Sequence, residues 1–115
     1  MELNVKLLTK EEVVINERVP YTINNNVLSF KIGEMLHTLD FINEIFIREN
    51  EEYAFTLNIK EKTSEIRLKK EEYILQVKVE YANLLTEKKE INLNYLIETD
   101  DNEMHLIIEL EGEIE

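Results

Sequence analysis

Alternation of apolar and polar residues is the dominant pattern of this chain, and it is clearest over residues 72–111. Three runs in this stretch, 72–81, 90–98 and 104–111, place apolar side chains at every second position. A two-residue period is that of a β-strand with one buried face. The pattern therefore predicts three consecutive strands that share an apolar face.

Short polar segments separate the predicted strands. Asn24–Asn26 and Asp100–Asn102 are interpreted as hairpin turns, because Asn and Asp tolerate the left-handed backbone that tight turns require. Glycine occurs only as Gly33 and Gly112. The turns are therefore expected to depend on Asn, Asp and charged residues.

The same alternation continues towards the N-terminus. It predicts further strands over residues 2–9, 13–23, 28–32, 53–59 and 66–68. Pro20 falls inside the second of these. Because proline has no backbone N–H, that strand is expected to lie at a sheet edge or to contain a bulge.

Residues 34–49 fit two periods at once. Some apolar residues lie at helical spacing, namely Met35, Leu36, Leu39, Ile42 and Phe46. The segment 41–49 also fits a strand. We predict a loop or helical turn over 34–40, followed by a strand over 41–49.

These elements predict an all-β fold in a single domain, 1–115. Consecutive strands joined by short turns form an antiparallel sheet. A sheet of about 8–9 strands must cover its apolar face, so it closes into a barrel or splits into a sandwich. We predict a single antiparallel barrel, since a meander closes on itself without crossing loops.

The order of elements resembles that of the YwiB-like family, small bacterial β-barrels of the calycin type. The likeness is best over Tyr73–Gly112, which includes the strand Ile91-Asn-Leu-Asn-Tyr95. It extends more weakly to Asn25–Phe30 and Ile45–Glu51. The resemblance implies a calycin- or lipocalin-like barrel, and it brings no established activity.

Charge and cysteine content exclude several classes of function. The formal net charge of −12 argues against nucleic acid and anionic membranes as partners, because both are bound by basic surfaces. The chain has no cysteine, so thiolate catalysis, zinc–thiolate sites and disulfides are excluded. With no apparent signal or membrane-spanning segment, a cytoplasmic location is expected.

Candidate catalytic and metal-binding residues are few. His37 lies near Asp40, but spacing pairs no nucleophile with it, and His105 is expected on the outer surface. The acidic cluster Asp100, Asp101 and Glu103 lacks the spacing of a calcium loop. We therefore predict no enzyme activity, no metal site and no cofactor.

Tyrosines give the more specific hypothesis. Tyr53, Tyr73, Tyr81 and Tyr95 share the inward strand phase. Tyr53, Tyr73 and Tyr95 are the candidate residues to line a cavity that binds a small apolar or aromatic molecule. The alternative is that they fill the core and that no ligand binds.

A filled barrel would point to a structural or protein-interaction role. Ile74, Leu96 and Ile107 are apolar residues on the nominally polar faces of successive strands. Such residues can mark an interface when they gather into one patch. Self-association through these three residues, or through a sheet edge, is therefore the second hypothesis.

Overall fold

The computed structural model describes residues 2–9, 13–87, 89–98 and 103–110. In these residues it contains ten strands, Glu2–Leu8 (β1), Val13–Asn24 (β2), Val27–Ile32 (β3), Met35–Asp40 (β4), Ile45–Glu49 (β5), Tyr53–Asn58 (β6), Thr63–Leu68 (β7), Tyr73–Thr86 (β8), Glu90–Ile97 (β9) and Met104–Leu110 (β10). Each strand pairs antiparallel with its sequence neighbour, and β1 also pairs with β10, so the sheet closes into a barrel. The predicted fold class is confirmed. No helix in the described part of the chain is long and apolar enough to cross a membrane.

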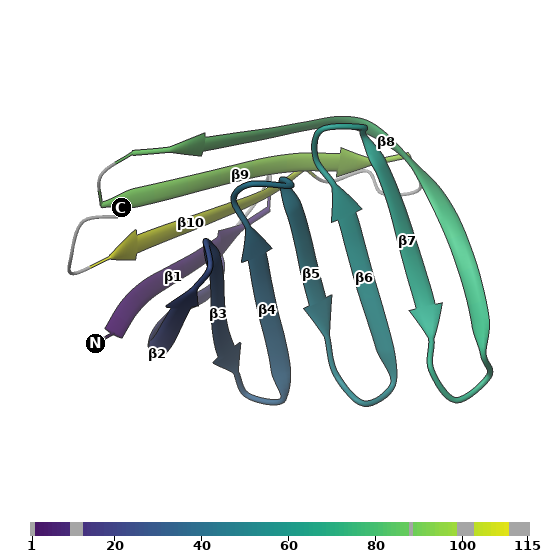
Figure 1. The fold of residues 1–115 in the computed structure, drawn as a ribbon, viewed down its shortest axis with the longest axis horizontal. Coiled ribbons are helices and arrows are strands. Elements are labelled where there is room, and N and C mark those ends of the chain that lie inside the picture. Colours follow the sequence, from purple (N-terminus) through teal and green to yellow (C-terminus); the bar gives the residue numbers. More distant parts are fainter. Residues whose placement is uncertain (1, 10–12, 88, 99–102, 111–115) are drawn as a thin grey trace.

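The barrel consists of two layers whose strands cross (Figure 1). One layer holds β1, β9 and β10, and the other holds β3 to β7. The long strands β2 and β8 belong to both layers: β2 pairs with β1 up to Pro20 and with β3 from Tyr21. Strands that change layer in this way form the corners of orthogonally packed sheets. Pro20 thus lies at a corner of the barrel. Its part of β2 pairs with β1 but not with β3, as expected for a proline at a sheet edge.

The core occupies the space between the two layers. Alternate residues of β1, β3 and β9 face it, as the sequence pattern predicts. The most completely buried side chains are Leu3, Val5, Leu28, Leu39, Leu57, Ile91, Leu93 and Ile108. Both layers contribute side chains to this set, so each layer covers the apolar face of the other.

The predicted loop or helical turn over 34–40 is wrong. Residues Met35–Asp40 form β4, and His37 and Leu39 are buried on its inner face. The inner face of β4 carries a histidine among apolar residues, and this polar residue concealed the alternation. Local helical spacing was overridden by pairing with β3 and β5.

The strand expected over 41–49 begins later, at Ile45. Residues 41–44 form the turn between β4 and β5. The Asp40 carboxylate accepts hydrogen bonds from the backbone N–H groups of Ile42 and Asn43 at 3.0 Å each. This turn separates two strands where the sequence predicted one, which explains ten strands in place of nine.

The inward phase predicted for Tyr81 is also wrong. The register of β8 against β9 shifts between Val79 and Tyr81, because a β-bulge inserts an extra residue and reverses the faces beyond it. Ala82 is therefore buried, and Tyr81 faces outward. Its hydroxyl donates a hydrogen bond to the Glu103 carboxylate, which raises the pKa of Tyr81 to about 12.

Turns without glycine occur as expected. Asn25 and Asn26 have φ values of 53° and 65° between β2 and β3, so this predicted hairpin turn is confirmed. Positive φ values also occur at Glu44, Lys62 and Glu72. The predicted turn at Asp100–Asn102 lies outside the described residues.

Gly33 provides a test of turn strain. Its φ is +61°, and a Cβ added there would meet nothing within 4 Å. We expect Gly33→Ala to lower the free energy of unfolding by roughly 1–2 kcal/mol, because only the left-handed backbone is strained. Urea denaturation measures this loss. Glu34→Ala, at the neighbouring exposed position, is the control and is expected to be near neutral; an equal loss in both would contradict this reasoning.

Candidate functional site

A cavity of about 190 Å³, open to solvent, lies between the inner faces of the two layers. It is lined by Arg48, Tyr53, Phe55, Ile66, Tyr95, Ile97 and Met104. These residues come from β5, β6 and β7 of one layer and from β9 and β10 of the other. An apolar cavity of roughly 150 Å³ in another protein holds benzene. The cavity here is therefore large enough for one aromatic ring with a small substituent.

The adjoining part of the barrel interior is filled. Only about 10 Å³ remains free between Val5, Leu7, His37 and their neighbours, and a single water needs roughly 10–15 Å³. Arg48 and Tyr95 line both this space and the larger cavity. These two residues thus mark the boundary between the filled interior and the free volume of the cavity.

Aromatic rings connect the filled interior with the cavity. The His37 ring stacks on Phe30, with centroids 4.8 Å apart and planes 3° from parallel. Tyr95 contacts Phe46 at 6.3 Å and Phe55 at 5.8 Å between centroids. These distances are typical of attractive aromatic pairs, so one wall of the cavity is a packed aromatic surface.

Two of the three candidate tyrosines, Tyr53 and Tyr95, meet in this cavity. Tyr73 does not line it, and its side chain is 55% exposed. It lies opposite Leu68 near the tip of the β7–β8 hairpin, which extends well away from β9 and β10 (Figure 1). Leu75, the next inward position, lies opposite Ile66 of the cavity lining and is 45% exposed. The inner face of this hairpin is therefore an apolar surface beside the cavity.

His37 is an interior residue that sequence reasoning placed in a loop. It is 3% exposed. Burial lowers its pKa to about 4, and the positive charge of Arg48 adds to this effect. The ring is therefore neutral at pH 7. Asp40 lies on the opposite face of β4, where it binds the following turn, so the two residues do not form a catalytic pair.

Arg48 is the second interior residue that the sequence did not reveal. It faces inward on β5, opposite His37 and Phe55. Its Nε is buried and has no hydrogen-bond partner among the described residues. In the sequence, Ile45–Arg48 is apolar on both faces apart from the arginine. Periodicity could not show which way Arg48 points.

No family model, curated protein or solved structure matches this chain. The function must therefore be inferred from the chemistry of the site itself.

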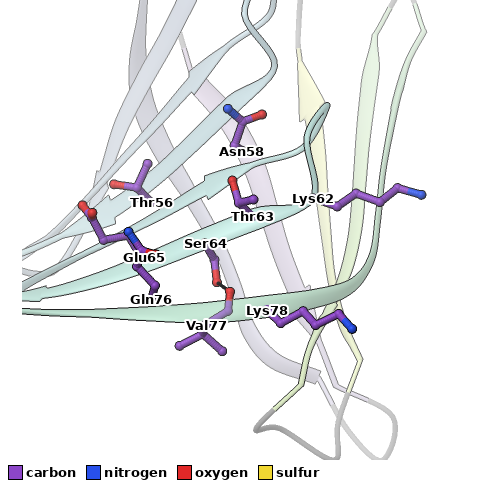
Figure 2. A pocket seen from close by; sticks show the side chains of 9 residues that line it. All are labelled: Thr56, Asn58, Lys62, Thr63, Ser64, Glu65, Gln76, Val77 and Lys78. Carbon is purple, nitrogen blue, oxygen red and sulfur yellow. Dashed lines mark hydrogen bonds between the residues drawn. The ribbon is translucent and has the colours of Figure 1, made fainter.

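A wider hollow of about 570 Å³ lies on the outer faces of β6, β7 and β8 (Figure 2). Its lining is largely polar, with Thr56, Asn58, Thr63 and Gln76 beside charged side chains. Figure 2 shows Ser64 turned towards β8, where its hydroxyl donates a 2.6 Å hydrogen bond to the Val77 carbonyl. That hydroxyl is thus engaged within the sheet. The described residues that line the hollow include no aromatic side chain and no buried unpaired polar atom, so it is the weaker candidate.

The three residues of the predicted outer patch lie at separate places. Ile74 pairs with Arg67 near the hairpin tip and is 49% exposed. Leu96 pairs with Tyr81 on the far side of the β8 bulge, and Ile107 pairs with Asn92. Ile74 and Tyr81, the partner of Leu96, are seven positions apart on β8, roughly 23 Å along an extended strand. These residues are not brought into one patch within a single molecule.

His105 lies on the outer face of β10, as expected, where a ring nitrogen is 3.0 Å from the Asn92 side-chain oxygen. Within the described residues, no three histidine, aspartate or glutamate side chains form a group that could hold a metal ion. The open cavity lined by Arg48, Tyr53 and Tyr95 is therefore the site with the most distinctive chemistry.

Proposed function

We propose that this protein binds a small apolar or aromatic molecule inside the barrel, between Tyr53 and Tyr95. The observation that carries the proposal is the cavity of about 190 Å³ between the two layers. Ligand sites in proteins are typically concave and mostly apolar, with a few polar groups that fix orientation. The lining here has that composition, with aromatic and aliphatic side chains and a single arginine.

The surroundings of the cavity support the same proposal. Packed aromatic rings form one wall, and a planar ligand can stack on such a wall. The exposed inner face of the β7–β8 hairpin, with Leu68, Tyr73 and Leu75, lies beside Ile66 of the lining. These apolar residues would cover a ligand at the cavity or guide its entry.

A cavity-filling substitution tests the proposal. We expect toluene to shift the NMR signals of residues around Tyr95, and Ile97→Phe to weaken this binding at least tenfold, because the larger ring occupies the free volume. Leu96→Phe is the matched control, since Leu96 is the preceding residue and faces outward. Equal toluene binding by both variants, or no binding by the unmodified protein, would overturn the proposal.

The alternative proposal is a structural or interaction module that self-associates through Ile74, Leu96 or Ile107. Its support is the exposure of Ile74. Native mass spectrometry of gently purified protein separates the two proposals. A monomer with an adduct that is lost on denaturation supports ligand binding, whereas a dimer that Ile74→Glu converts into monomer supports the alternative.

We also propose that the protein acts in the cytoplasm and belongs among the YwiB-like, calycin-type barrels. A cysteine-free chain suits a reducing compartment. The antiparallel meander barrel is compatible with the fold that the resemblance implies. Cell fractionation with an antibody against the protein tests the proposed location.

A further inference from the structure

We propose that the ligand of the barrel cavity is a single-ring aromatic carboxylate, and that the guanidinium group of Arg48 binds its carboxylate. This inference rests on the proposed function, because it specifies the ligand class of the same cavity. It follows from the position of Arg48, from the charges around it and from the size of the cavity.

The position of Arg48 places a cation at the inner boundary of the free volume. Arg48 lines both the filled part of the interior and the cavity. Its strand neighbours on the same face are His37 and Phe55. Directly opposite side chains in antiparallel strands have Cβ atoms about 5 Å apart. The arginine therefore stands between an imidazole and a phenyl ring.

No described side chain in this part of the barrel compensates the charge of Arg48. Among the described residues, it is the only charged one that lines either space. Arg48 forms no ion pair with a described residue, and its buried Nε lacks a hydrogen-bond partner among them. Arg48 is half-buried. Its Nε is withdrawn from water without a partner, and an unsatisfied buried donor is destabilising. An anionic ligand would supply the missing charge and acceptor atoms.

His37 does not compete for the anion as a second cation. Its pKa of about 4, lowered by burial and by Arg48, keeps the ring neutral at pH 7. Within the part of the chain that the structure describes, Arg48 is thus the one positive group that lines the cavity. Its planar fork of N–H donors matches the two oxygens of a carboxylate better than a lysine would.

The remainder of the cavity selects the other end of the ligand. The lining offers aromatic and aliphatic surface from Phe55, Ile66, Tyr95 and Ile97. A small hydrated anion such as acetate would leave this apolar surface uncovered, so it is not the ligand that fits best. The volume of about 190 Å³ accommodates about one ring. A flat ring with one carboxylate satisfies both the apolar walls and the arginine.

The experiment compares two probes of nearly equal shape, benzoate and benzamide, at pH 7 by NMR titration. We expect benzoate to bind about tenfold more tightly than benzamide, because its two anionic oxygens can accept a bidentate pair of hydrogen bonds from Arg48, whereas benzamide offers one neutral acceptor oxygen. In Arg48→Met the preference is expected to fall to within about twofold, while benzamide binding persists. Arg67→Met removes an exposed arginine of β7 and is the control, which keeps the preference.

The outcomes distinguish this inference from the function on which it rests. If toluene and benzamide bind in the cavity and benzoate is not preferred, the carboxylate inference fails and the proposed function stands. If none of the three probes binds, both fail. Should Arg48→Met not fold, the benzoate preference of the unmodified protein and its partial loss in Arg48→Lys decide the question. A preference that is unchanged in Arg48→Lys would overturn the role of the guanidinium fork.

Discussion

Leu93→Ala is expected to lower the free energy of unfolding by roughly 2–5 kcal/mol. Leu93 is fully buried at the centre of β9, where it lies opposite Leu84 of β8 and Leu106 of β10. Truncation removes apolar contacts and leaves a cavity that the surrounding strands cannot close, because both neighbours are held by backbone pairing. Urea denaturation followed by circular dichroism measures the loss.

Leu85→Ala is the matched control for this prediction. The chemical change is identical, but Leu85 is 57% exposed on β8. Its truncation is expected to change the free energy of unfolding by no more than about 0.5 kcal/mol. Similar losses in Leu93→Ala and Leu85→Ala would show that the interior is not packed as the structure describes.

Protonation of His37 is expected to destabilise the fold at mildly acidic pH. The pKa is about 4 in the folded protein, lowered by burial and by Arg48, against a value of 6.5 for a free histidine. As the pH falls from about 6.5 to about 4, the unfolded chain binds a proton that the folded protein excludes. The free energy of unfolding therefore falls with the pH over this window, by about 3 kcal/mol in all. Below a pH of about 4 both states are protonated and this contribution no longer changes.

His37→Phe removes this titration and retains a ring beside Phe30 and Phe46, the present neighbours of His37. We expect its free energy of unfolding to depend less on pH than that of the unmodified protein, by about 3 kcal/mol between pH 6.5 and 4. Carboxylates titrate in both proteins, so the difference between the two curves isolates His37. His105→Gln is the control, because His105 lies on the outer face beside Asn92. If the free energy of unfolding of His37→Phe depends on pH as strongly as that of the unmodified protein, His37 is not buried in its neutral form.

Several features of the fold were predictable because they depend on local pattern. The alternation in β9 and β10 placed Tyr95, Leu93 and Leu106 on the buried face. The Asn25–Asn26 turn was predictable from the backbone preference of asparagine. These features need only the strand period and turn chemistry, so nearby residues suffice to predict them.

Other features escaped prediction because distant residues decide them. Tyr81 faces outward because β8 forms a bulge against β9. The residues of β8 alone do not predict this bulge. Tyr73 has the inward phase, yet it is largely exposed because its hairpin extends beyond the facing layer. The alternation along a strand predicts on which face of the sheet a side chain lies. It does not predict whether another layer covers that face.

An all-β meander with short polar turns follows from the amino-acid pattern alone, since strand period and turn preference are properties of neighbouring residues. The inward positions of His37 and Arg48, and the meeting of Tyr53 and Tyr95 at one cavity, depend on how the strands pack in three dimensions. The cavity exists because two layers cross. Its lining comes from β5, β6 and β7 of one layer and from β9 and β10 of the other, two groups that lie far apart in the chain. The burial that neutralises His37 and the surroundings that leave Arg48 without a counter-charge among the described residues arise only when those strands pack together.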